Sequence, residues 1–255
     1  MEEIRYEVAS GVATLTIDRP AKKGAMTYAM LAEFTDRIDA AGADPEVGVL
    51  LVTGVPGSFC AGIDLADLAS RSPDDRGGGR QRGVPALMEC PKPVVCAVDG
   101  MAVGMGAEFA TQADIRLVSP RARFRWNFVH RGLVSDTGAG TWLLPRQIGT
   151  PAALWLLYTG DDLGADEAVA TGFAAGVHPS EELGKAAREL AERIATASPF
   201  ALSRTKQLVL SGAGTTMADH VGATRDALTE CFASEDHAEG VAAFLQRRPA
   251  RFTGR

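Results

Sequence analysis

Two glycine-rich turns carry the residues of this sequence that are best suited to chemistry. They span residues 58–65 and 99–108, and each follows a continuous apolar run (47–52 and 94–98) typical of a buried strand. Small residues let a ligand approach the backbone, and a helix starting near Met105 would leave its first N–H groups unpaired. Such an arrangement can hold an anion or a developing oxyanion, and Glu108 lies one helical turn further on, where it can face the same cavity.

Each turn taken alone could be only a turn. Gly104 and Gly106 could also suggest a dinucleotide fold, but the sixth position of the GxGxxG pattern is Phe109. Gly104 also lies six residues beyond the predicted strand, which is too far for the usual tight turn. A dinucleotide site is therefore disfavoured.

Hydrophobic periodicity predicts the elements that must position these turns. Residues 4–8 and 12–17 alternate as a hairpin does, Thr27 can cap a helix that runs to about Ala41, and residues 115–118 form a further strand. Residues 70–83 are predicted to be a surface loop. From residue 151 onward the pattern is helical, with helices expected at 151–158, 165–171, 181–197, 200–211, 217–232 and 237–247. Strands interleaved with helices indicate α/β crossovers.

The composition excludes several classes of function. The 255 residues are 46% hydrophobic and carry a formal net charge of −6, which gives no electrostatic reason to expect nucleic-acid binding. The four cysteines form no CxxC pair and the four histidines are scattered, so neither a metal site nor a disulfide scaffold is expected. Cys60 adjoins the first turn but has no base nearby in sequence. Residues 1–5 lack an apolar stretch, so we expect no targeting segment and a cytoplasmic location.

Five stretches together resemble the enoyl-CoA hydratase/isomerase (crotonase) family. Residues 19–26 (RPAKKGAM) resemble its RPxxxNAL motif, with Gly24 in place of asparagine. Residues 59–65 (FCAGIDL) resemble FxAGxDL, and residues 99–108 (DGMAVGMGAE) resemble NGxAxGGGxEL. Residues 159–172 and 239–254 resemble two further segments near the end of the family pattern. The resemblance covers nearly the whole chain, in the right order.

The resemblance implies a fold, a site and an assembly. The fold class is α/β: a spiral of ββα units with a C-terminal helical oligomerisation region. We expect residues 1–195 to form the core with the acyl-CoA site, and residues 196–255 to build a homotrimer or a hexamer made of two trimers. The backbone N–H groups of Ile63 and Met105 would form the oxyanion hole. The substrate would be an acyl-CoA thioester, with no cofactor and no metal. The implied CoA-binding residues are Lys22, Lys23, Ala25, Ala61, Asp64, Leu65, Arg251 and Phe252, of which the C-terminal ones would reach a neighbouring subunit.

The carboxylates depart from the family pattern. Family hydratases use two glutamates; the first matches Glu108, but the second would fall at Phe128, which cannot exchange a proton. Residues 132–145 resemble the GLxPDxGGTWLLPR stretch of ring-epoxide isomerases, so Asp136 is the candidate base and Glu108 the partner acid or the group that orients the acyl chain. Alternatively, Glu108 could only balance the helix dipole and Asp136 could only be a turn or cap residue. The expected acyl-pocket residues are Phe124, Trp126, Phe128, Leu133 and Trp142, of which Phe128 and the tryptophans could instead be plain core.

Double-bond isomerisation in an unsaturated acyl-CoA is therefore the predicted reaction. Hydration of a 2-enoyl-CoA, with Glu108 and a water held by Asp136, is the first alternative. A non-catalytic acyl-CoA-binding protein would bind CoA esters tightly without turnover. A purely structural oligomer would bind none of them, and the two glycine-rich turns disfavour it.

Overall fold

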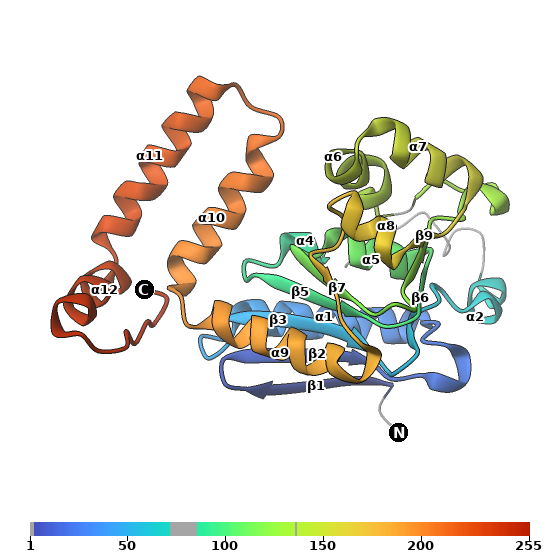
Figure 1. Ribbon diagram of the computed structural model, residues 1–255, viewed down its shortest axis with the longest axis horizontal. Helices are drawn as coiled ribbons and strands as arrows, with labels where there is room; N and C mark the ends of the chain where they lie inside the picture. The colour runs from blue at the N-terminus through green and yellow to red at the C-terminus, as the bar shows by residue number, and fades with distance from the viewer. Residues whose placement is uncertain (1–2, 72–85, 136) are drawn as a thin grey trace.

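The computed structural model describes residues 3–71, 86–135 and 137–255, which form two sheets covered by helices (Figure 1). The strands of the larger sheet are β1 (Ile4–Ala9), β2 (Val12–Ile17), β3 (Val49–Gly54), β5 (Val94–Val98), β7 (Ile115–Val118) and β10 (Gly176–Val177). They lie in the order β1-β2-β3-β5-β7-β10, and every pair except β1·β2 is parallel. The hairpin and the three buried strands expected from the sequence are confirmed.

A second, smaller sheet lies beside the first. Its strands are β4 (Ser58–Cys60), β6 (Met101–Val103), β8 (Arg123–Arg125) and β9 (Leu163–Gly164), in the order β4-β6-β8-β9. The chain visits the two sheets alternately, since β3 leads to β4, β5 to β6, and β7 to β8. The first two of these strand pairs each lead into a helix, which is the predicted spiral of ββα units.

The helices are α1 (Tyr28–Ala43), α2 (Leu65–Ser70), α4 (Ala86–Glu89), α5 (Met105–Gln112), α6 (Leu144–Ile148), α7 (Thr150–Thr159), α8 (Ala165–Ala170), α9 (Ser180–Ala195), α10 (Pro199–Gly212), α11 (Met217–Ala233) and α12 (Glu235–Gln246). Short 3₁₀ turns form η1 (Pro20–Lys22) and η2 (Val129–Arg131), and a π-helical turn forms η3 (Ala139–Leu143). The predicted helices agree to within two or three residues at their ends. The predicted loop at residues 70–83 lies almost wholly outside the described residues.

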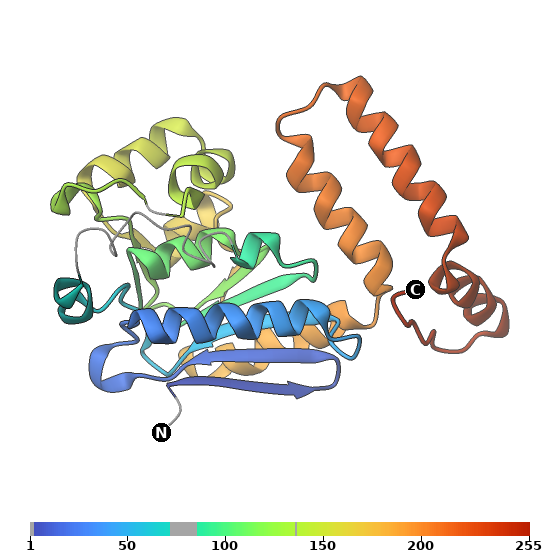
Figure 2. The same cartoon turned by 180° about the vertical axis from the view of Figure 1, so that it is seen from behind.

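Both faces of the central strands β3 and β5 of the larger sheet are buried, which explains their continuous apolar runs. Val49 and Leu51 of β3 pack with Leu183 and other residues of α9. Leu50 and Val52, which alternate with them, belong to the main core cluster together with residues of α1. Helices α9 and α1 therefore lie on opposite faces of the sheet, in front of it in Figure 1 and Figure 2 respectively.

Helices α10 to α12 form an arm that extends away from the body (Figure 1). Helices α10 and α11 contain no buried residue, and apolar side chains such as Phe244, 82% exposed, face solvent. Lys206 of α10 ties the arm to the body, because its Nζ lies 2.9 Å from Asp114 Oδ2 and donates to the carbonyl oxygens of Leu87 and Lys92. The division into domains at residues 195 and 196 stays a prediction.

No helix within the described residues is both long and apolar enough to cross a lipid bilayer.

Candidate active site

The first glycine-rich turn joins β4 to α2 and is held in place by residues 19–26. Met26 N–H donates to Gly62 O, and Asp64 N–H donates to Met26 O, both at 2.8 Å. In this parallel bridge the N–H and C=O groups of Ile63 point away from Met26. Among the described residues, no hydrogen bond engages the amide of Ile63. That amide is therefore available on the side of the turn away from residues 23–26.

Asp64 has a structural task in this turn. Its side chain accepts from Ala66 N–H at 2.9 Å, which caps α2, and its Oδ2 lies 2.8 Å from Arg19 Nη1. The hydrogen bond from Ala66, followed by that from Arg19, lowers the pKa of the Asp64 carboxyl. The Asp64 carboxylate therefore links the first turn to α2 and to Arg19.

The second turn joins β6 to α5 and approaches the first turn closely. Gly62 has φ +91°, and a β-carbon built on it would lie 2.8 Å from Val103 O and 3.6 Å from Met105 N. A β-carbon on Gly106 would lie only 2.1 Å from the carbonyl oxygen of Cys60. Two glycines thus let the N-terminus of α5 pack directly against the first turn. Within residues 3–71, 86–135 and 137–255, no hydrogen bond is made by the Met105 amide, which stands at the positive end of the helix dipole.

Glu108 lies on the first turn of α5 and is fully buried. Its Oε2 accepts hydrogen bonds from the Thr137 hydroxyl and, at 3.1 Å, from the Gly140 amide of η3. Burying a carboxylate is costly unless donors compensate for the lost water, and these two donors do so. The hydrogen bonds from Thr137 and from Gly140 of η3 show that Glu108 does more than balance the helix dipole.

The thiols of two buried cysteines in the sheets are unreactive. Burial raises the pKa of the thiols of Cys60 in β4 and Cys96 in β5 to about 12. Neither is a thiolate at neutral pH, so neither is a nucleophile there. This outcome agrees with the absence of a base near Cys60 in the sequence.

The comparison with known proteins assigns the family. The family model described as enoyl-CoA hydratase/isomerase matches residues 7–255. This chain belongs to the enoyl-CoA hydratase/isomerase, or crotonase, family. It is 36% identical to the 1,2-epoxyphenylacetyl-CoA isomerase of Escherichia coli, with all of both chains covered. It is 34% identical to the crotonyl-CoA hydratase of Syntrophomonas wolfei, with 98% of each chain covered.

Solved crotonase-family structures share the whole fold. The enoyl-CoA hydratase from Mycobacterium tuberculosis superposes with a TM-score of 0.92 at 32% sequence identity, and 99% of each chain is covered. The chain is therefore an acyl-CoA enzyme of a family that contains both hydratases and isomerases.

Phe128 stands beside the N-terminus of α5 in this crotonase fold. Its side chain is 9% exposed, and its Cζ lies 3.9 Å from a β-carbon built on Gly104. The same point lies 4.0 Å from Asn127 Oδ1, a polar group near the site that the sequence analysis did not single out. An aromatic ring thus occupies the place where the family resemblance would put the second glutamate.

The five expected acyl-pocket residues do not form one wall. Phe124 and Trp126 are fully buried and pack against Phe173, with ring centroids 4.9 Å and 5.7 Å from that of Phe173. These two residues are therefore core, an alternative that the sequence analysis left open for Trp126 but not for Phe124. Leu133 and Trp142 are 53% and 39% exposed, and Arg146 covers the Trp142 ring. Phe128 lies next to Gly104, the N-cap residue of α5.

The expected CoA-binding residues fall into two groups. Lys22, Lys23, Ala25, Ala61, Asp64 and Leu65 gather around the first turn, where Ala61 N–H donates to Lys23 O at 3.1 Å. Arg251 and Phe252 follow α12 near the C-terminus, and Figure 1 shows this end of the chain on the side of the molecule opposite to α2. Within one chain, the structure does not bring the two groups together.

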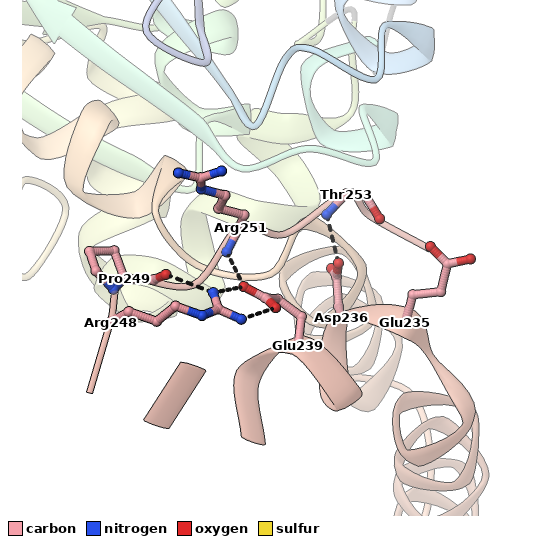
Figure 3. A pocket seen from close by; sticks show the side chains of 7 residues that line it. All are labelled: Glu235, Asp236, Glu239, Arg248, Pro249, Arg251 and Thr253. Carbon is pink, nitrogen blue, oxygen red and sulfur yellow. Dashed lines mark hydrogen bonds and ion pairs between the residues drawn. The ribbon is translucent and has the colours of Figure 1, made fainter. Parts of the chain in front are cut away.

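Arg251, but not Phe252, lines a separate pocket of about 520 Å³ together with Asp236, Glu239 and Arg248 (Figure 3). Glu239 accepts hydrogen bonds from both Nη atoms of Arg248 and from the Arg251 amide, and the bonds from Arg248 are the larger cause that lowers its pKa to about 2. Asp236 accepts from the Thr253 amide at 2.7 Å. These hydrogen bonds hold residues 248–253 against α12. The charged residues of this pocket therefore have a structural role, which is to fix the C-terminal segment in place.

Asp136, the candidate base, lies outside the described residues. Thr137 and Gly140, which hold Glu108, are two further site residues that the sequence analysis did not single out. They are 29 and 32 residues away from it along the chain, and no spacing rule connects them.

Proposed function

We propose that this protein isomerises a double bond in an unsaturated acyl-CoA by way of a thioester enolate. A base removes a proton from a carbon conjugated with the thioester, and the electron pair moves through the double bond onto the thioester oxygen. An acid then returns a proton at the other end of the conjugated system, so the product has the same atoms as the substrate. The proposed reaction moves only protons and needs no cofactor or metal beyond the CoA thioester itself.

The amides of Ile63 and Met105 are the proposed donors to that oxygen. Support comes from the close approach of Gly62 to Met105 N, and from the fact that neither amide donates a hydrogen bond to another described residue. Preorganised donors act where the charge develops, and each is typically worth about 3 kcal/mol in the transition state.

The observation that favours isomerisation over hydration is the aromatic ring of Phe128. Adding water across a double bond requires groups that hold and deprotonate the water. Glu108 is one such group, but a phenyl ring is not a second one. The similarity to a protein named 1,2-epoxyphenylacetyl-CoA isomerase supports the same choice.

Asp136 is the proposed base, and its replacement by asparagine tests that role. Asp136→Asn is expected to lower the rate of isomerisation by about 10²- to 10⁴-fold, because the amide cannot accept the substrate proton. Binding of the CoA ester, followed by isothermal titration calorimetry, should be unchanged. An Asp136→Asn enzyme with wild-type turnover would remove Asp136 from the mechanism.

Hydration of a 2-enoyl-CoA is the second candidate, because several relatives, among them the crotonyl-CoA hydratase, carry that name. Incubation with enoyl-, dienoyl- and aryl-CoA panels in heavy water, followed by mass spectrometry, separates the two. Deuterium exchange without addition of water supports isomerisation, and addition of one water supports hydration. Tight binding without either reaction would identify a non-catalytic acyl-CoA-binding protein.

The proposed assembly is a homotrimer or a pair of trimers built through the arm. The exposed apolar side chains of α11 and α12 support it, among them Phe232, Phe244 and Leu245. In such an assembly Arg251 and Phe252 would contact the CoA of a neighbouring subunit.

A further inference from the structure

The hydroxyl of Thr137 is held in one orientation. The amide of Ala139 donates to Thr137 Oγ1 at 3.1 Å, and the same hydroxyl lies within hydrogen-bond reach of Glu108 Oε2. A carboxylate oxygen can only accept, and a hydroxyl has a single hydrogen to donate. Since Ala139 supplies its own hydrogen, the hydrogen of Thr137 is directed at Glu108.

A second donor converges on the same carboxylate oxygen. The amide of Gly140 donates to Glu108 Oε2 at 3.1 Å, so Oε2 accepts two hydrogen bonds from one short segment of chain. Two hydrogens already directed at Oε2 leave little room for a third. When Glu108 carries a proton, that proton is therefore held on Oε1.

The hydroxyl of Ser135 lies near Oε1 and makes no hydrogen bond with the described residues. A β-carbon built on Gly140 would lie 2.4 Å from Glu108 Oε1 and 2.6 Å from Ser135 Oγ, which places both oxygens around one point. Ser135 is 9% exposed, and its hydroxyl has no hydrogen-bond partner among the described residues. A buried hydroxyl without a partner is unusual in a native fold and is consistent with a bound group on this side.

We propose that Thr137 is a positioning residue, which together with the Gly140 amide reserves Oε2 for the protein and leaves Oε1 to exchange the proton with the substrate. This role rests on the proposed function, in which Glu108 takes part in proton transfer. It assigns to Thr137 an effect on the rate of the reaction with no effect on the binding of the CoA ester.

Three variants test this role through steady-state kinetics. Thr137→Val keeps the shape of the side chain and removes the donor, and Thr137→Ser restores the hydroxyl. Thr141→Val is the matched control, because Thr141 lies in the same segment and its exposed hydroxyl donates to Gly138 O at 3.3 Å and to no other group among the described residues. We expect kcat to fall about 10- to 100-fold in Thr137→Val at unchanged KM, and to stay within about threefold of wild type in the other two variants. A Thr137→Val enzyme with wild-type kcat, or a Thr137→Ser enzyme as slow as Thr137→Val, would overturn the proposal.

A spectroscopic readout separates this proposal from the proposed reaction. The carboxylate stretching band of Glu108, assigned in difference infrared spectra with Glu108→Gln, should shift in Thr137→Val and return in Thr137→Ser. An unchanged band in Thr137→Val would overturn the role of Thr137 whatever the enzyme turns over. If the band shifts in Thr137→Val but the wild-type protein converts no CoA ester, the proposed reaction is refuted instead.

Discussion

Glu108→Gln is expected to lower kcat by about 10³-fold while the protein remains folded and continues to bind CoA esters. The glutamine carbonyl oxygen can still accept hydrogen bonds from Thr137 and Gly140, which hold Oε2 in the native protein. Its NH₂ group would then take the place of Oε1 and cannot exchange a proton with a carbon acid. General acid–base groups typically contribute 10²- to 10⁴-fold, so an intermediate value is expected.

The measurement is a comparison of kcat, KM and melting temperature with the most active substrate of the heavy-water panel. Glu89→Gln is the matched control, because Glu89 is an exposed glutamate on α4 and should leave all three unchanged. If Glu108→Gln retained more than a tenth of wild-type kcat, Glu108 would have no part in proton transfer. A large loss of melting temperature would instead show that its burial serves mainly to hold η3 against α5.

Gly106→Ala is expected to destabilise the protein by about 3 kcal/mol or more. The added methyl group would lie 2.1 Å from the carbonyl oxygen of Cys60 and 2.8 Å from its β-carbon. Both atoms belong to a buried strand that pairs with β6, so neither can move without displacing its neighbours. Overpacking against fixed backbone typically costs 1–3 kcal/mol, and occasionally more.

Urea denaturation of Gly106→Ala, followed by circular dichroism, measures the free energy of unfolding. Gly184→Ala is the control, because Gly184 lies on an exposed part of α9 and a β-carbon there would contact nothing within 4 Å. That variant should be more stable than wild type by about 0.5–1 kcal/mol, since alanine is the better helix former. A Gly106→Ala protein as stable as wild type would mean that α5 can move away from β4 at little cost.

The sequence predicted the larger sheet well because its strands have a clear hydrophobic signature. Residues 4–17 alternate as a hairpin does, and the runs near 50 and 96 are apolar throughout because α1 and α9 cover both faces. The smaller sheet was missed. Its strands β4, β6, β8 and β9 are two or three residues long, which is too short for a periodicity to develop, and their pairing depends on where the larger sheet places their ends.

The site was predicted to the extent that it depends on one local element. Glu108 was found because a helix that starts after a glycine turn fixes the direction of its first residues. Thr137 and Gly140 were not found, because their contact with Glu108 depends on the π-helical turn η3. No sequence pattern that we recognised predicts such a turn. Phe124 and Trp126 share one face of an extended segment with period two, but Phe173, which covers that face, comes 47 residues after Trp126.

The two buried thiols in the sheets, those of Cys60 and Cys96, can be used to measure local opening of the protein. Cys60 lies beneath the glycine turn and Cys96 in the middle of the larger sheet, and both are completely enclosed. An alkylating reagent can modify them only during the brief intervals in which the strands separate and water enters. The rate at which each thiol is alkylated therefore reports the frequency of local opening of its sheet. The more accessible Cys231 on the arm gives the reference rate for a thiol that needs no such opening.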